Sequence, residues 1–153
     1  MGNSPTVFLQ KKDVSCNSTD LFGEAIEAAK AADIVVVVAG LNLTEEREDF
    51  DRVSLLLPGK QMNLIHTVAS VTKKPLVLVL LGGGPVDVSF AKHDPRIASI
   101  LWLGYPGEVG GQVLPEILFG KYNPGEYNLL PEREQDLHVL QICNEKVVAV
   151  ELI

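Results

Sequence analysis

Apolar and polar positions alternate in two ways along the middle of the chain. Three runs are apolar at nearly every position, at residues 34–39, 75–81 and 97–103. Runs of this kind are typical of parallel strands that are covered on both faces. Three other stretches, at residues 18–32, 61–71 and 112–119, carry apolar residues at helical spacing. Such an order of helices and strands predicts parallel strands joined by right-handed crossovers. We therefore expect an α/β fold, a flavodoxin-like doubly wound sandwich with a mostly parallel sheet.

The two ends of the chain differ from this middle part. Residues 1–17 form an irregular lead-in, residues 18–125 the domain, and residues 126–153 a tail that begins polar and ends in VVAVELI. We expect this last run to form an edge strand. Pro115 is best tolerated in a first helical turn, so the last helix is predicted to begin close to Gln112.

Composition excludes several kinds of partner. The net charge of −7, without a cluster of Lys and Arg, argues against binding to nucleic acid. No run reaches the roughly 18 apolar residues of a membrane span, and the N-terminus does not read as a signal peptide. The scattered histidines His66, His93 and His138 have no cysteine pair beside them, so no metal site is expected.

A glycine run, Gly82-Gly83-Gly84-Pro85, follows the second apolar run. It matches neither of the glycine motifs that hold phosphates, and no lysine follows it. We interpret it as a tight turn that needs positive φ, and we expect no nucleotide or other cofactor.

An acidic loop follows the first apolar run. Residues 40–61 read GLNLTEEREDFDRVSLLLPGKQ and include Glu45, Glu46, Glu48, Asp49 and Asp51. Ligand sites of open α/β sheets lie outside the carboxyl ends of the strands, where the turns at 82–84 and 104–107 also belong. Two interpretations stay open. One glutamate is a general acid/base oriented by the arginines, or the loop is solvated and its charges pair locally.

The order and spacing of the motifs resemble the C-terminal domain of plant β-D-xylosidases of glycoside hydrolase family 3. The motifs, which span roughly residues 15–125, are Gly40-Leu41-Asn42, Glu46-Arg47-Glu48, Asp51-Arg52, Leu56-Leu57-Pro58-Gly59-Lys60-Gln61, Gly83-Gly84-Pro85-Val86-Asp87-Val88, Phe90-Ala91, Asp94-Pro95-Arg96-Ile97, Trp102-Leu103-Gly104-Tyr105-Pro106-Gly107-Glu108, Gly110-Gly111, Phe119-Gly120 and Asn123-Pro124-Gly125.

This resemblance implies a retaining hydrolase that removes β-linked xylose, or arabinose, from xylan-derived oligosaccharides. In the family an Asp nucleophile sits on a preceding (β/α)8 barrel, and a Glu acid/base sits on the α/β sandwich domain. The implied acid/base is Glu46, with Glu48 as the second candidate, and Asp51 and Arg52 are expected to hold the loop. The expected partners are the barrel domain and a xylo-oligosaccharide, and the expected location of the parent enzyme is the plant cell wall.

The chain also departs from the family. It has no room for a barrel, so we expect a fragment that is inactive alone. After Asn123-Pro124-Gly125 the family continues with Gly, Leu-Pro and Thr-Trp-Tyr, whereas this chain reads EYNLLPE. The divergent tail at 126–153 suggests the hypothesis of a truncated gene product. The alternative function is a non-catalytic module that binds carbohydrate or docks onto a barrel.

Overall fold

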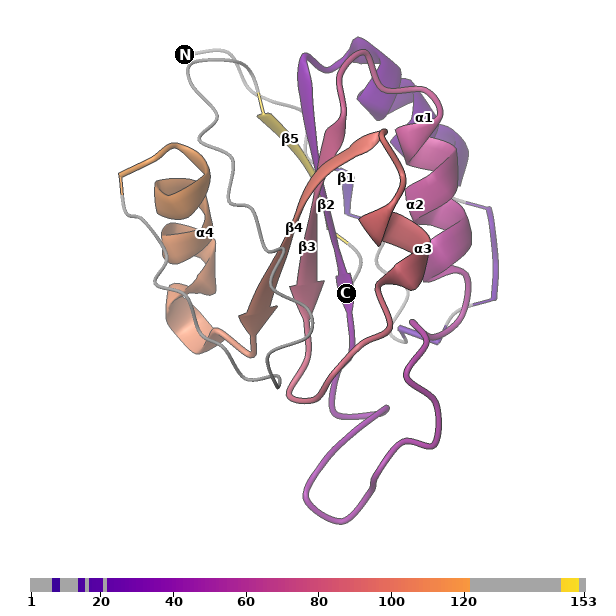
Figure 1. The fold of residues 1–153 in the computed structure, drawn as a ribbon, viewed down its shortest axis with the longest axis vertical. Coiled ribbons are helices and arrows are strands. Elements are labelled where there is room, and N and C mark those ends of the chain that lie inside the picture. Colours follow the sequence, from indigo (N-terminus) through magenta and orange to yellow (C-terminus); the bar gives the residue numbers. More distant parts are fainter. Residues whose placement is uncertain (1–6, 9–13, 16, 21, 122–146, 152–153) are drawn as a thin grey trace.

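The computed structural model describes residues 7–8, 14–15, 17–20, 22–121 and 147–151 (Figure 1). The elements, in chain order, are β1 (Val7–Phe8), α1 (Phe22–Ala31), β2 (Ile34–Gly40), α2 (Gln61–Ala69), β3 (Leu76–Leu81), α3 (Ser89–Lys92), β4 (Ile97–Gly104), the 3-10 turn η1 (Gly107–Val109), α4 (Gly110–Leu118) and β5 (Val147–Glu151). The strands form one sheet in the order β1-β5-β2-β3-β4, and every pairing is parallel. The predicted α/β fold is confirmed.

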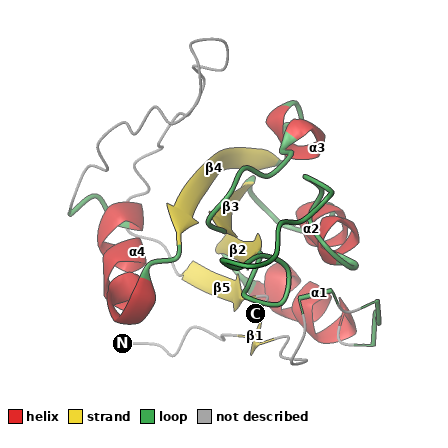
Figure 2. Ribbon diagram, turned by 90° about the horizontal axis from the view of Figure 1, so that it is seen from below, coloured by secondary structure: helices red, strands yellow, loops and turns green. Residues whose placement is uncertain are grey.

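Helices cover both faces of this sheet, as a doubly wound arrangement requires. On one face, α1, α2 and α3 pack through residues such as Ala29, Leu64 and Ala91. On the other face, Leu118 of α4 packs against alternate residues of β2 and β3 (Figure 2). Every residue of β2 is buried because both of its faces are covered. The continuous apolar run at residues 34–39 is thereby explained.

The prediction of an edge strand at the end of the chain is wrong. β5 lies between β1 and β2, in register with β2 from Ile34↔Val147 to Val38↔Glu151. The backbone of β2 can pair on two sides, and β3 occupies one of them. The other side of β2 is therefore available for backbone pairing, and β5 pairs there although it comes much later in the chain.

The last helix begins earlier than predicted. α4 starts at Gly110, directly after η1, so Pro115 lies inside the helix and not in its first turn. Proline has no N–H, so Pro115 cannot donate to the carbonyl of Gly111 one turn earlier. The 3-10 turn moves the start because its backbone runs on into the helix without a break.

Three short elements, β1, η1 and α3, have no counterpart in the prediction. The lead-in was expected to be irregular, but Val7–Phe8 form β1, which pairs with β5. α3 has four residues, too few to show helical spacing in the sequence. The carboxylate of Asp87 accepts a hydrogen bond from the N–H of Ser89 at 2.8 Å, which closes a turn directly before α3. Most of the predicted lead-in and tail lies outside the described residues.

The carboxyl ends of β2, β3 and β4 lie at the same edge of the sheet, as predicted. The loop of residues 41–60 projects from this edge at the bottom of Figure 1. Gly40 ends β2 with φ 149°, and a Cβ atom there would lie 2.0 Å from the carbonyl oxygen of Leu81. Only glycine fits where the loop leaves the sheet.

Candidate active site

A single carboxylate, that of Glu46, connects the ends of the three long strands. Its Oε1 atom accepts hydrogen bonds from the backbone N–H of Gly83 at 2.5 Å and from the Tyr105 hydroxyl at 2.7 Å. Its Oε2 atom accepts one from Nε of Arg52 at 3.2 Å. Gly83 follows β3 and Tyr105 follows β4. Glu46 therefore ties the loop after β2 to the ends of both neighbouring strands.

These contacts keep Glu46 ionised. Burial raises the pKa of its carboxyl, because a charge is less stable away from water. The hydrogen bonds from Tyr105, Gly83 and Arg52, together with the positive charge of Arg52, outweigh burial and leave the pKa below 4.5. Burial and the Glu46 carboxylate together raise the pKa of Tyr105 to about 12. At neutral pH a carboxylate thus accepts a hydrogen bond from a neutral phenol.

Arg52 holds the loop at a second point. Its side chain is 11% exposed, and besides Glu46 it donates to the carbonyl of Ser54 at 2.9 Å and to the carbonyl of Pro85. The bond to Pro85 reaches the turn after β3. One guanidinium therefore joins three parts of the strand edge, a geometry that its planar fork of donors allows.

The backbone of the glycine run at 82–84 lies close to the Glu46 carboxylate. A Cβ atom on Gly83 would lie 3.3 Å from Oε1 of Glu46 and 3.2 Å from the Tyr105 ring, and one on Gly84 would lie 3.2 Å from Oε2. The interpretation of this run as a turn with positive φ is wrong, since the positive-φ glycines of the described residues are at other positions. Glycine at these positions lets the backbone and the carboxylate approach closely, and a Cβ atom would press on the carboxylate.

The second candidate, Glu48, lies apart from this network. Arg47 and Phe50 exchange backbone hydrogen bonds of 3.1 and 2.9 Å, which closes a tight turn with Glu48 and Asp49 at its tip. The Arg47 guanidinium lies 5.2 Å from the centroid of the Phe50 ring. Both acidic side chains are exposed and make no hydrogen bond or ion pair within the described part of the chain.

Comparison with known families identifies the domain. Residues 5–131 match the family model described as the glycosyl hydrolase family 3 C-terminal domain. The chain belongs to glycoside hydrolase family 3. The resemblance drawn from the loop motifs is confirmed, and the parallel α/β sandwich is the fold of this family 3 domain.

Several similar curated proteins carry the name β-xylosidase. A protein from Arabidopsis thaliana named "Probable beta-D-xylosidase 6" is 67% identical over 113 residues, which are 74% of this chain and 14% of that protein. "Beta-D-xylosidase 1" of the same plant is 50% identical over 112 residues, which are 73% of this chain and 14% of that protein. This chain thus spans only 14% of the length of these relatives.

Solved structures of family 3 enzymes share the fold. A "GH3 exo-beta-xylosidase (XlnD) in complex with xylobiose aziridine activity based probe" matches with a TM-score of 0.68 and 39% identity, over 72% of this chain and 14% of that one. The Bifidobacterium adolescentis GH3 beta-glucosidase matches with a TM-score of 0.64 and 37% identity, over 71% of this chain and 16% of that one.

The sequence-predicted residues of the family 3 loop divide into two groups. Glu46 and Arg52 are joined in the network at the strand edge. Glu48 and Asp51 are exposed, and neither contacts that network through a hydrogen bond or ion pair in the described residues. No role for Tyr105 was predicted from the sequence. Tyr105 lies in the Gly-Tyr-Pro-Gly turn at 104–107, which was expected at the same edge of the sheet as the acidic loop. A tyrosine hydroxyl at that edge could have been predicted to contact the loop.

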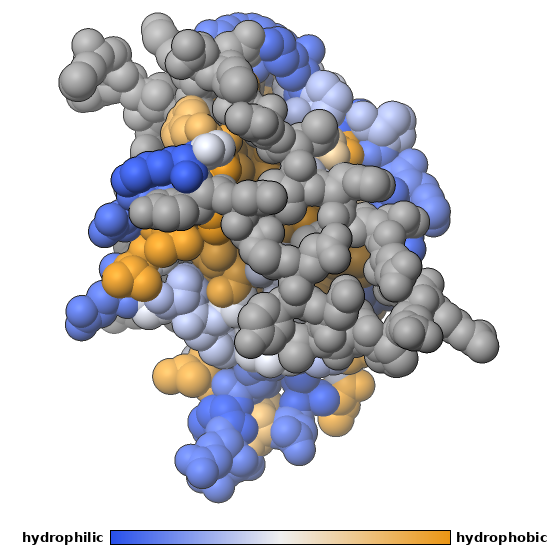
Figure 3. Space-filling view, turned by 60° about the vertical axis from the view of Figure 1, so that its left-hand side comes forward, coloured by the Kyte–Doolittle hydropathy of each residue, from blue (hydrophilic) through white to orange (hydrophobic). Residues whose placement is uncertain are grey.

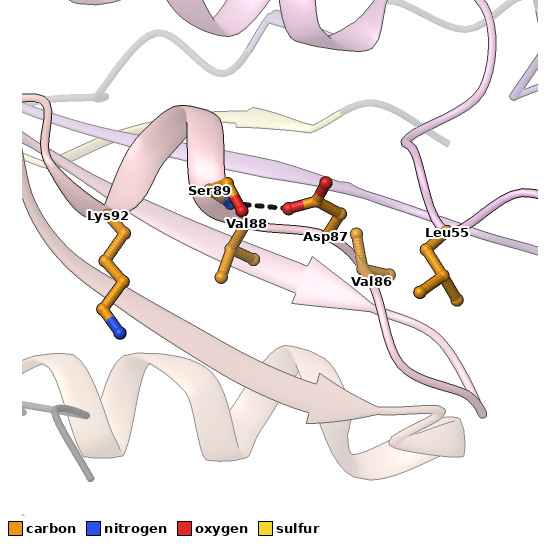
Figure 4. Close-up of a pocket in the computed structure, with 6 residues that line it drawn as sticks. All are labelled: Leu55, Val86, Asp87, Val88, Ser89 and Lys92. Carbon is orange, nitrogen blue, oxygen red and sulfur yellow. Dashed lines mark hydrogen bonds between the residues drawn. The ribbon is translucent and has the colours of Figure 1, made fainter. Parts of the chain in front are cut away.

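A shallow pocket of about 200 Å³ lies between the end of the loop and α3 (Figure 4). Its lining consists of Leu55, Val86, Asp87, Val88, Ser89 and Lys92. The Asp87 and Lys92 side chains point to opposite sides in Figure 4, and Asp87 is already bonded to the N–H of Ser89. Because the polar groups do not converge, we do not assign the chemistry to this pocket.

The described residues offer neither a metal site nor a membrane-spanning helix. They hold no group of three or more His, Cys, Asp or Glu side chains that could bind a metal ion. Within the same residues, no helix has the length and apolar character to cross a membrane. The acidic loop and the network around Glu46 are therefore the candidate site in this part of the chain.

Proposed function

We propose that this chain supplies the acid/base half of the active site of a retaining β-xylosidase. Its family membership and its similarity to β-xylosidases support the reaction class. The observation that carries the proposal is the loop of residues 41–60, which projects from the strand edge with glutamates in two different settings. The substrate would be a xylo-oligosaccharide that loses a terminal β-linked xylose.

The geometry favours Glu48 for proton transfer and Glu46 for positioning, which exchanges the roles predicted from sequence. A general acid must carry a proton near the working pH. Glu46 is ionised and accepts three hydrogen bonds, so it has no proton to donate. Glu48 is exposed and unbonded within the described residues. Its carboxyl is therefore open to a substrate or to a second domain.

The second carboxylate of the reaction would come from another domain. Retaining glycosidases hold two carboxyl groups about 5 Å apart, one as nucleophile and one as acid/base. Following the family pattern, we assign the nucleophile to a (β/α)8 barrel that precedes this domain in the parent enzyme. Without that carboxylate and the sugar pocket, the chain has nothing to protonate, so we expect it to be inactive alone.

The loop also offers a contact surface for such a domain. Several of its apolar side chains are exposed, with Val53 fully accessible at 106%; the others are Leu43, Phe50, Leu55 and Leu56. Figure 3 shows apolar and hydrophilic side chains side by side at this lower end of the molecule, and a second apolar area on its side. Exposed apolar side chains around an acidic tip fit a surface that is buried in a larger protein.

Reconstitution tests this function. The chain is mixed with a separately produced barrel domain of the relative that is 67% identical, and hydrolysis of aryl β-xylosides is measured. We expect no hydrolysis by either part alone and measurable hydrolysis by the mixture. Hydrolysis by the purified chain alone, abolished by Glu46→Gln, would contradict both the proposed incompleteness and the proposed roles.

The exposed apolar loop also suits the second candidate, a non-catalytic module that docks onto a barrel or binds carbohydrate. Val53→Asp should weaken association with the barrel in sedimentation experiments if the loop is the contact. Calorimetry with xylotriose separates the two cases. A monomeric chain that binds the sugar without any barrel favours the carbohydrate-binding module over the half-site.

We further propose that the parent enzyme acts in the plant cell wall. Two glycosylation sequons support a secretory route, at Asn17-Ser18-Thr19 and Asn42-Leu43-Thr44. Asn17 is exposed and Asn42 is partly exposed. The full-length protein expressed in plant cells should lose mass on treatment with an N-glycan-removing enzyme. An unchanged mass and retention inside the cell would argue against this location.

A further inference from the structure

Gln61 joins the two ends of the acidic loop. Gly40 is the last residue of β2 and Gln61 is the first residue of α2, so the loop of residues 41–60 begins and ends at these two positions. Gln61 is only 4% exposed, and in the described residues just one other polar residue, Ser99, is buried. A polar side chain at such a position needs a specific reason.

The side-chain amide of Gln61 is fully used at this point. Oε1 accepts a hydrogen bond from the N–H of Gly40 at 2.7 Å. Nε2 donates to the carbonyl of Gly40 at 2.7 Å and to the carbonyl of Val14 at 3.2 Å. One amide thus satisfies both backbone groups of the last residue of β2, as a neighbouring strand would.

The sheet explains why these backbone groups need Gln61. The N–H of Leu41 donates to the carbonyl of Leu81 on the β3 side. Neighbouring residues of a strand bond to opposite sides, so the groups of Gly40 face the β5 side. The described pairing of β2 with β5 ends earlier, at Val38↔Glu151. Beyond the described part of that pairing, Gln61 therefore takes the position of a strand residue beside Gly40.

The loop then has two points of attachment, Gln61 at its base and Glu46 in its middle. A long loop has many conformations, and fixing its base removes part of this freedom. Glu46 lies six residues after Gly40 and must reach the N–H of Gly83 to enter its network. A base that drifts away from the sheet would move Glu46, and with it the tip that bears Glu48.

We propose that Gln61 is a positioning residue of the acid/base loop, which holds the loop base against β2 so that Glu46 reaches the strand edge and Glu48 projects beyond it. Its catalytic consequence rests on the proposed function. The positioning itself does not, since it concerns contacts within this chain. An apolar side chain of the same size would fill the core equally well but would leave the loop base unbonded.

Solution NMR on the 153-residue chain tests the positioning, with the amide proton of Gly83 as reporter because it donates to Glu46. In the unaltered chain its chemical shift should follow the protonation of Glu46, with a midpoint below 4.5. In Gln61→Met we expect this response to disappear and hydrogen exchange at Gly83 to become about tenfold faster. The amides of Val77 and Val79 in β3 should exchange at unchanged rates.

Gln112→Met is the matched control, because Gln112 is exposed on α4. Gln61→Glu is the second variant if Gln61→Met does not fold: its carboxylate can still accept from Gly40 but has no N–H to donate. We expect an intermediate effect in this variant. Unchanged exchange and titration at Gly83 in every folded Gln61 variant would overturn the proposal.

Kinetics of the full-length enzyme separate this inference from the proposed function. If the loop is an acid/base loop, Gln61→Met should lower kcat about tenfold, because misplacement of a catalytic group slows the chemical step, with KM nearly unchanged. If the Gly83 signal changes in Gln61→Met but kcat does not, Gln61 positions the loop and this positioning has no effect on catalysis. Full-length enzyme without glycosidase activity would refute the proposed function alone.

Discussion

The base and the tip of the acidic loop differ in almost every physical respect. We count Glu46 and Arg52 together with Gly40 and Gln61 as the base. The polar groups of these four residues are bonded, and each residue bonds across to another element or turn. At the tip, Glu48 is exposed and unbonded in the described residues. Residues close together in one acidic segment therefore differ in their bonding and exposure. The base fixes position, while the tip remains available to another molecule or domain.

The proposed acid/base role requires such a difference within the loop. A loop fixed at every residue could not accommodate a substrate, and a loop fixed nowhere would not hold a carboxylate in place. In this domain the ionised Glu46 provides stability through Tyr105, Gly83 and Arg52. Glu48 is left free of such contacts. Substitutions at the base should thus affect folding, and substitutions at the tip should affect only function.

The largest effect is expected at Gly40. Gly40→Ala places a Cβ atom 2.0 Å from the carbonyl oxygen of Leu81 at φ 149° and must push β2 and β3 apart. We expect a loss of about 3 kcal/mol in the free energy of unfolding, measured by urea denaturation. Gly111→Ala is the control, since no atom lies within 4 Å of its added Cβ. Equal effects at the two glycines would contradict a rigid base.

Arg52→Met should have the next largest effect. It removes the hydrogen bonds to Ser54 and Pro85 and leaves the mostly buried Glu46 carboxylate without its cation. We expect a cost of about 1–3 kcal/mol. Arg47→Met at the tip, which removes only the contact with the Phe50 ring and one bond to the carbonyl of Leu43, should cost about 0.5 kcal/mol. Urea denaturation compares the two variants. A larger loss of stability in Arg47→Met than in Arg52→Met would refute the distinction between base and tip.

Acid should weaken the base through Glu46. The pKa of Glu46 is lowered on folding, so its contribution to stability is present above pH 4.5 and is lost as the pH falls through the folded value. Glu46→Gln should remove this part of the pH dependence. Asp94, with a pKa of about 2 because Arg96 binds it, is the internal comparison. Asp94→Asn should act at lower pH, between 3.8 and 2; thermal melts from pH 6 to 2 distinguish the two windows.

The smallest effect on stability is expected at the tip. Glu48→Gln removes a charge from an exposed side chain that has no bonded partner in the described residues. The free energy of unfolding should change by less than about 0.5 kcal/mol. Calorimetric melts of the variant and the unaltered chain check this. A clear loss of stability would mean that Glu48 belongs to the base and that the two regions are not distinct.

The position of this site at the strand edge was easier to predict from the sequence than the contacts of its individual residues. Parallel strands have their carboxyl ends at one edge, so the meeting of the loop with the turns at 82–84 and 104–107 followed from the order of elements alone. The choice between Glu46 and Glu48 did not follow. It depends on Tyr105 and on the N–H of Gly83, which are far away in the chain, and spacing within an acidic segment carries no information about them.

The misplaced elements have equally physical reasons. β5 pairs with β2 across more than a hundred residues, and a short apolar run does not reveal on which side of a sheet it will pair. The glycines at 82–84 were interpreted as conformational, whereas at Gly83 and Gly84 the Glu46 carboxylate packs closely on the backbone from another segment. Gln61 ends a recognised motif, but its role depends on a vacant side of β2 that only the assembled sheet reveals.

The kinetics of two glutamine variants in the full-length enzyme test the central claim most directly. We predict that Glu48→Gln lowers kcat by about 10²- to 10⁴-fold for xylosides with poor leaving groups, much less for activated aryl xylosides, and that added azide restores the rate. Glu46→Gln should show neither the dependence on the leaving group nor the rescue. If Glu46→Gln shows both and Glu48→Gln resembles the unaltered enzyme, the proposed roles of the base and the tip are contradicted.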